Sequence, residues 1–214
     1  MIAAITEASQ EALDILRDGS TFSWTTVTLL AFVFYVYAVE IERRRWDIIL
    51  AGIAFFLMDV FNELVNSAIL QISDRSALWT VTGDSSYLIL VGWCIEIVFL
   101  FLVTGIIFVK QLPPDPRTRI LGVPNRVFLV LAFSILCVLV EVFLESTGYF
   151  HWDYWWWNVP FVPLIVIFGY ATFFAIAAYV YDLGTNHRKQ LRIVGGMAAI
   201  NATLAVGFGL AGWL

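Results

Sequence analysis

The sequence predicts an all-α fold, a polytopic transmembrane helical bundle that forms one domain over residues 1–214. Three observations predict it: 61% of the residues are hydrophobic, only 14% are charged, and long apolar runs recur along the chain between short polar connections. So little polar surface cannot cover a water-soluble globule of this size. The net charge of −5, without a sustained basic run, excludes nucleic acid as a partner and leaves membrane lipids as the surroundings.

The first segment, residues 1–20, is expected to lie at the membrane interface as a short amphipathic helix. Its apolar residues are Ile2, Ile5, Leu13 and Leu16, and Gly19 ends it. It has acidic residues where a secretory signal would have a basic region, which argues against a cleaved signal. The helical bundle then occupies residues 22–214.

Six apolar runs come close to the ~20 residues that a helix needs to cross the hydrocarbon core of a bilayer. They cover residues 22–40, 47–72, 86–109, 126–146, 159–182 and 193–214. Of the 12 basic residues, only Arg17 and Arg75 fall outside the connections on one side of these spans. The positive-inside rule therefore predicts a multi-pass protein with both termini on the non-cytoplasmic side.

Acidic residues inside these spans point to the functional site. The second span carries four polar residues at i, i+3, i+4 and i+7, which places them on one face: Asp59, Asn62, Glu63 and Asn66. The third and fourth spans add Glu96, Glu141 and Glu145. Each acid costs at least ~2–3 kcal/mol at a helix centre, and no basic residue lies at their depth. They are therefore expected to meet in one interior, open to the outer leaflet, where they hold protons, bind a cation or only join helices by hydrogen bonds.

A local match suggests a parallel internal repeat that relates the second and third spans to the fourth and fifth. Asp59–Glu63 and Glu141–Glu145 share the pattern acid-Val-Phe-x-Glu. Both segments run in the same direction and precede a Trp, at Trp79 and Trp152. The repeat predicts a pseudo-twofold axis along the membrane normal, with two pairs of acids facing across it.

Missing residue types narrow the chemistry to these carboxylates. Lys110 and Lys189 lie at the cytoplasmic edge, which excludes a retinal Schiff base, and His151 and His187 lie in loops, which disfavours haem or a di-iron centre. No serine nucleophile motif occurs. We therefore expect no cofactor and no metal, but general acid and base catalysis in an apolar cavity. Glu63 and Glu141 are the expected proton donor and acceptor, tuned by Asp59, Glu96 and Glu145.

The substrate that reaches such a cavity from the membrane is expected to be an apolar lipid, and an isoprenoid alkene or epoxide is the one that a proton activates most readily. Protonation gives a carbocation, which aromatic faces stabilise. The predicted substrate-binding residues are Asn62, Asn66, Trp93, Tyr154, Trp155, Trp156 and Tyr170. Capture of the cation by an internal alkene would make the protein a cyclase, and capture by water would make it a hydratase.

Two stretches resemble known families. Residues Glu141–Tyr170, with two acids four residues apart, then Gly-Tyr, Trp, Pro and Gly-aromatic, resemble integral-membrane carotenoid hydratases. Residues Asp59–Glu96 are similar to integral-membrane terpene cyclases of meroterpenoid pathways. The resemblance implies a lyase or isomerase of isoprenoid biosynthesis, and maps Glu63 onto the cyclases' catalytic acid in the second helix. The cyclases also have an acid in their last helix, where this chain has none.

Other functions fit the same pattern. A proton or cation transporter or channel uses acids at this depth. A divalent-metal enzyme could use the carboxylates as Mg²⁺ ligands. An accessory subunit or a homo-oligomer could pack through the small residues Gly195, Ala199, Ala205 and Gly209 of the last span.

Overall fold

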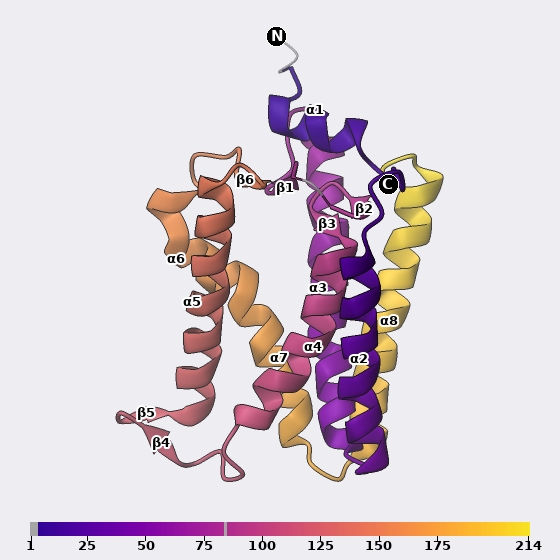
Figure 1. Cartoon of the computed structure of the whole chain (residues 1–214). Helices are drawn as coiled ribbons and strands as arrows, with labels where there is room; N and C mark the ends of the chain where they lie inside the picture. Colours follow the sequence, from indigo (N-terminus) through magenta and orange to yellow (C-terminus); the bar gives the residue numbers. More distant parts are fainter. Residues whose placement is uncertain (1–3, 84) are drawn as a thin grey trace.

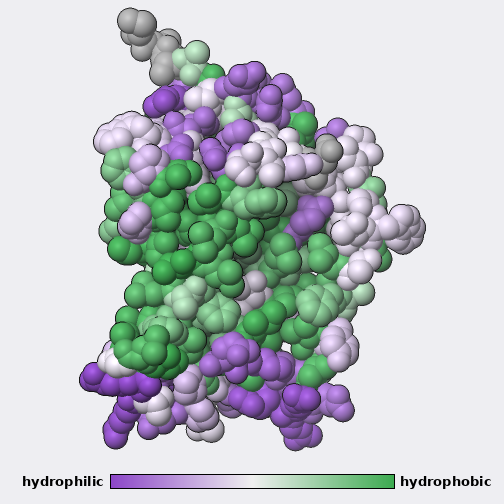
Figure 2. Space-filling view, turned by 60° about the vertical axis from the view of Figure 1, so that its left-hand side comes forward, coloured by the Kyte–Doolittle hydropathy of each residue, from purple (hydrophilic) through white to green (hydrophobic). Residues whose placement is uncertain are grey.

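The computed structural model describes residues 4–83 and 85–214, and it confirms an all-helical bundle of membrane-spanning length (Figure 1). Five helical segments are long and apolar enough to cross a membrane: α2 (Trp24–Glu42), α3 (Trp46–Ser73), α5 (Asn125–Ser146), the broken segment Val159–Asp182, and α8 (His187–Leu210). Figure 2 shows a broad hydrophobic belt between two hydrophilic ends. The chain ends marked in Figure 1 lie at one end of the bundle, which we call the termini end. The three connections rich in arginine and lysine lie at the opposite end, which we call the basic end.

The third predicted span begins later than expected. The prediction of a helix over residues 86–109 is wrong at its start, because β2 (Leu88–Leu90) and β3 (Trp93–Cys94) form a hairpin there, and α4 covers Ile95–Gln111. Gly92 lies in the hairpin turn, where a Cβ atom would come within 2.5 Å of the Trp79 ring. With 17 residues, α4 is about 25 Å long, slightly short of the hydrocarbon thickness.

The helices at the two ends of the chain also differ from their predicted bounds. The interfacial helix is confirmed as α1 (Glu7–Asp14), which lies on the termini end of the bundle with Ala12 fully buried (Figure 1). Ile2, part of the predicted apolar face, lies outside the described residues. α8 begins before the predicted residue 193, because the Asn186 side chain caps it by accepting a hydrogen bond from the Lys189 amide.

α3 is the central helix, and α4, α7 (Ala171–Asp182) and α8 pack around it. Its contact with α4 is close, since a Cβ atom added to Gly105 would lie 2.9 Å from the Gly52 carbonyl oxygen. Such close approach of backbones is typical of helix pairs in membranes. Beside this contact, four aromatic rings pack together as a phenylalanine layer: Phe55, Phe108, Phe133 and Phe174.

The fifth span is not one regular helix. It starts as a 3₁₀ turn at Val159–Phe161, continues through α6 (Val162–Leu164), and widens into the π-helical turn η2 (Ile165–Tyr170) before α7. Prolines at 160 and 163 lack the amide hydrogens that a regular helix would use, which accounts for an irregular start. π-Helical turns inside helices are frequent at functional sites.

Short strands close the connections. β1 (Thr80–Val81) follows α3 and pairs antiparallel with β6 (Phe150–His151), which follows α5, while β4 (Arg119–Ile120) and β5 (Val123–Pro124) form a hairpin at the basic end. The two segments that the predicted repeat relates therefore meet at β1 and β6. Their packing is unequal, because α3 packs closely on α7, whereas the backbones of α4 and α5 lie farther apart and these helices meet through the rings of Phe108 and Phe133. The repeat itself stays a prediction.

Candidate functional site

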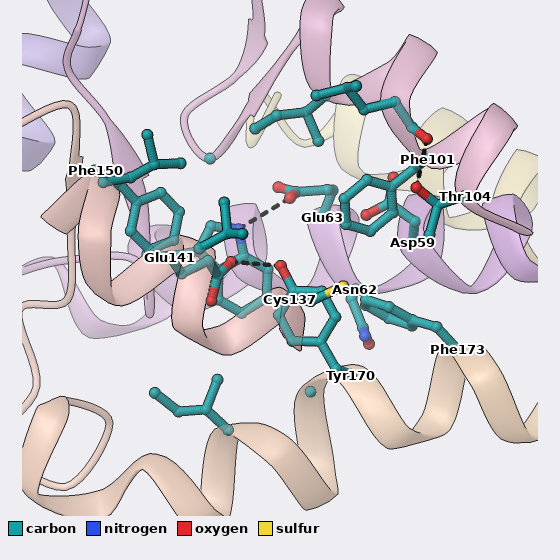
Figure 3. Close-up of a pocket in the computed structure, with 18 of the residues that line it drawn as sticks. Asp59, Asn62, Glu63, Phe101, Thr104, Cys137, Glu141, Phe150, Tyr170 and Phe173 are labelled. Atoms are coloured by element: carbon teal, nitrogen blue, oxygen red, sulfur yellow. Dashed lines mark hydrogen bonds between the residues drawn. The ribbon is translucent and has the colours of Figure 1, made fainter. Parts of the chain in front are cut away.

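A cavity of about 390 Å³ lies between α3, α4, α5 and the segment η2–α7 (Figure 3). Its lining is mostly apolar and aromatic, with a few polar groups that converge on it: Asp59, Asn62, Glu63, Thr104, Glu141 and Tyr170. Pockets of this size and composition commonly bind apolar molecules and use their few polar groups to orient them.

Three of the predicted acids line this cavity, and each receives a hydrogen bond from an aromatic side chain. The Trp93 Nε1–H donates to Asp59 Oδ2 over 2.9 Å, and the Trp79 Nε1–H donates to Glu63 Oε1 over 2.9 Å. These two acids are only 3% and 4% exposed. One oxygen of each carboxyl group is therefore held in place by an indole N–H.

The third acid, Glu141, comes from the opposite wall. Its Oε1 accepts a hydrogen bond of 2.7 Å from the Tyr170 hydroxyl, which lies at the end of the π-helical turn (Figure 3). Glu141 is half-buried whereas Tyr170 is 8% exposed. The sequence prediction that Glu63 and Glu141, from separate spans, share one cavity is therefore confirmed.

The cavity opens sideways, between α4 and α5. Its lining residues on these two helices are exposed on the outer surface of the bundle: Leu100, Ile107, Leu136 and Val140 are each between 45% and 57% exposed. All four lie inside these apolar helices, away from the polar connections, where lipid tails would surround a membrane-spanning bundle. A molecule can therefore enter the cavity from the membrane without crossing a polar surface.

Toward the basic end the cavity is closed by the phenylalanine layer. Phe55, Phe108 and Phe174 are fully buried, and the ring centroids of Phe108 and Phe174 are 4.8 Å apart. Such close packing leaves little room for water between the acids and the basic end.

Two predicted acids lie elsewhere, so the expectation that all five meet is wrong. Glu96 sits in the first turn of α4, where its carboxylate accepts hydrogen bonds from the Ser85 hydroxyl and the Ser86 amide. The late start of α4 places Glu96 at the termini end of the helix and away from its centre. Glu145 lies one turn beyond Glu141 on α5 and does not line the cavity.

The predicted substrate-binding residues divide in the same way. Asn62 and Tyr170 line the cavity. Trp93 does not line it, but donates a hydrogen bond to Asp59, which does. The Asn66 side chain holds the backbone of Leu78 and Trp79, so it fixes a loop. The prediction is wrong for the three aromatic residues of the loop that follows α5 and β6, which are Tyr154, Trp155 and Trp156. Tyr154 donates its hydroxyl to the Ser76 carbonyl, and both tryptophans are exposed.

Apart from Tyr170, the aromatic residues that line the cavity were not predicted as binding residues. They include Trp79, Trp152 and Trp157 at the termini end and Phe101 and Phe173 on α4 and α7. Trp152 and Trp157 are 4% and 7% exposed, and they belong to the same loop as Trp155 and Trp156. A loop has no periodicity, so the sequence cannot tell which of its tryptophans point inward.

The cavity has no evident metal-ligand cluster. Within residues 4–83 and 85–214, no group of three or more His, Cys, Asp or Glu side chains is arranged so that it could hold a metal ion.

The fold and the cavity define an integral membrane protein of the α-helical, polytopic class. A family described as an uncharacterized membrane protein family matches residues 6–210, and the chain belongs to this family. A relative from Archaeoglobus fulgidus, described as an uncharacterized protein, is 41% identical over 210 residues, which cover 98% of this chain and 99% of the relative. No solved structure matches the chain.

Proposed function

We propose that the protein is a membrane-embedded enzyme that performs acid and base chemistry on an apolar, isoprenoid-like lipid. One observation carries the proposal: Asp59, Glu63 and Glu141 line a single apolar cavity whose opening faces the hydrocarbon belt of the membrane. Acids that served only to join helices would bind across a helix contact, and would not border a cavity large enough for a ligand.

The reaction that fits these groups starts with proton transfer. A carboxylic acid adds its proton to one carbon of an alkene, and the positive charge forms on the more substituted neighbouring carbon. The π faces of residues such as Phe101, Tyr170 and Phe173 would stabilise this cation. The cation then closes on a second alkene and loses a proton from an adjacent carbon, or it binds water and loses a proton from that oxygen. In both cases the second carboxylate takes up a proton, and a proton then passes from it back to the donor, so that both acids regain their starting state before the next turnover.

Glu63 and Glu141 are the proposed donor and acceptor because they approach the cavity from opposite walls. Trp79 and Tyr170 each fix one oxygen of these carboxyl groups. A lipid between α3 and α5 would therefore meet one acid on each side. Asp59 lies one helical turn below Glu63, toward the phenylalanine layer, and would adjust the charge of the site.

The alternative is a proton or cation transporter or channel that uses the same acids. A conducting path would have to continue from Asp59 to the basic end, through the phenylalanine layer. The packing of that layer, together with the sideways opening, favours the enzyme over conduction.

The test is conversion of lipids in a host that makes linear isoprenoids and expresses this chain. Cyclisation leaves the mass of the lipid unchanged and shifts its chromatographic retention, whereas hydration adds the mass of one water molecule. Glu63→Gln and Glu141→Gln should each lower conversion by about 10²-fold or more, the size of a general acid or base contribution. Glu145→Gln is the matched control, because it lies on the same helix as Glu141 outside the cavity lining, and it should convert normally. Parent-like conversion by both cavity variants would refute the proposal.

A further inference from the structure

Two buried polar atoms in the cavity wall are left without a hydrogen-bond partner among the described residues. They are Glu63 Oε2, the oxygen that Trp79 does not hold, and Trp157 Nε1. Their residues are 4% and 7% exposed, and both line the cavity. Buried polar groups in proteins nearly always have a partner, so these two atoms indicate a polar group on the bound molecule.

The residues of these two atoms are neighbours of one side chain, Trp79. The Trp79 indole links them, because its Nε1–H donates to Glu63 Oε1 while its ring stacks on that of Trp157, with centroids 6.4 Å apart and planes 28° apart. Away from these two atoms, the wall facing α4 and α5 is apolar, with Phe101, Phe133 and Leu136 leading to the sideways opening. The cavity therefore combines unpaired polar atoms beside Trp79 with an apolar wall that leads to the sideways opening.

We infer that the lipid of the proposed function carries a hydroxyl group, which binds between Glu63 Oε2 and Trp157 Nε1. A hydroxyl oxygen accepts the indole N–H of Trp157, and its hydrogen is donated to the Glu63 carboxylate. If Glu63 holds a proton, the same oxygen accepts from both groups. A pure hydrocarbon satisfies neither atom, and a ketone satisfies both only while Glu63 holds a proton, whereas a hydroxyl group satisfies both in either protonation state of Glu63. The inference rests on the proposed function and names the class of lipid: an apolar alcohol whose tail points toward the gap between α4 and α5.

The experiment compares two lipids of the same skeleton on the purified full chain in lipid nanodiscs. One is geranylgeraniol, and the other is the hydrocarbon that has a hydrogen atom in place of its hydroxyl group. The parent should bind the alcohol about tenfold more tightly, as expected for two hydrogen bonds of ordinary net strength. Trp157→Phe removes one donor and keeps an aromatic ring, so it should weaken binding of the alcohol by about two- to tenfold and leave binding of the hydrocarbon unchanged.

Trp156→Phe is the matched control, because Trp156 is the adjacent residue, is 38% exposed and does not line the cavity. It should bind both lipids as the parent does. Unchanged binding of the hydrocarbon by Trp157→Phe also shows that this variant is folded. Equal affinity of the parent for the two lipids would overturn the inferred hydroxyl group and leave the proposed lipid site intact. If the parent bound neither lipid, the proposed function would fail as well.

Discussion

α3 and α5 form opposite walls of the cavity, yet they are held in very different ways. In an apolar stretch of 18 residues of α3, 56% of the residues are buried, because α4, α7 and α8 surround this helix. In the equivalent stretch of α5, only 11% are buried. The α3 wall presents Asp59 and Glu63, both buried, and the α5 wall presents Glu141, half-buried. The comparison indicates that α3 is the fixed wall of the site and that α5 is the wall that borders the membrane and admits the ligand.

The ion pairs at the basic end offer the largest test of this difference. Beside α3, Lys110 of α4 pairs with Glu40 of α2, whose side chain is only 2% exposed. On α5 itself, Arg126 pairs with Asp182 at the end of α7 over 2.6 Å, and the Asp182 side chain is 30% exposed. Lys110→Met should cost about 3–5 kcal/mol of folding free energy, because it leaves a buried carboxylate unpaired. Arg126→Met should cost about 1 kcal/mol, because Asp182 stays hydrated.

Thermal or denaturant unfolding in detergent measures both variants against the parent. If both variants lost the same folding free energy, the helices around α3 and around α5 would be held equally firmly. The contrast between a fixed wall and a peripheral wall would then be wrong.

Glycine substitutions give a smaller and more local effect. Gly105→Ala places a methyl group 2.9 Å from a backbone oxygen of α3, so α4 must move away, at a cost of about 1–3 kcal/mol. Gly169→Ala, on the α5 side, meets its nearest atom at 3.6 Å, which is an ordinary contact. This second variant should unfold at the same temperature as the parent. A destabilised Gly169→Ala together with an unaffected Gly105→Ala would reverse the comparison.

The smallest effect concerns the hydrogen bond that ties α8 to α3. The Asn201 side chain donates to the Leu57 carbonyl over 2.7 Å, and Asn201 is 6% exposed. Asn201→Leu should cost about 0.6 kcal/mol, the average for such bonds between membrane helices. Thr203→Val is the control, because Thr203 is exposed and bonds only within α8, to the Ala199 carbonyl. A loss from Asn201→Leu as large as that from Gly105→Ala would show that α8 helps to fix α3.

Hydropathy sufficed to predict the bundle, because a membrane-spanning helix must be apolar over its whole length. The i, i+3, i+4 spacing on α3 likewise predicted one polar face, and Asp59, Asn62 and Glu63 do line the cavity. The start of α4 could not be predicted, because residues 86–94 are as apolar as a helix and differ from one only in the hairpin that Gly92 permits. The misplaced Glu96 follows directly from that error.

The partners of the acids depend on contacts that no local pattern encodes. Trp79 is 16 residues from Glu63 along the chain, and Tyr170 is 29 residues from Glu141. Only the tertiary packing brings each donor to its acid. The sideways opening likewise depends on the spacing of two helices, α4 and α5, which meet through Phe108 and Phe133, and each of them is an ordinary apolar span in the sequence.

The central claim is that a membrane lipid occupies the cavity between the two walls. An experimental structure of the chain in a lipid nanodisc tests it most directly. We expect elongated density that enters between α4 and α5 and ends beside Glu63, with the Glu141 carboxyl group on its other side. A closed contact between α4 and α5, or a single ordered ion among the carboxylates without elongated density, would contradict it.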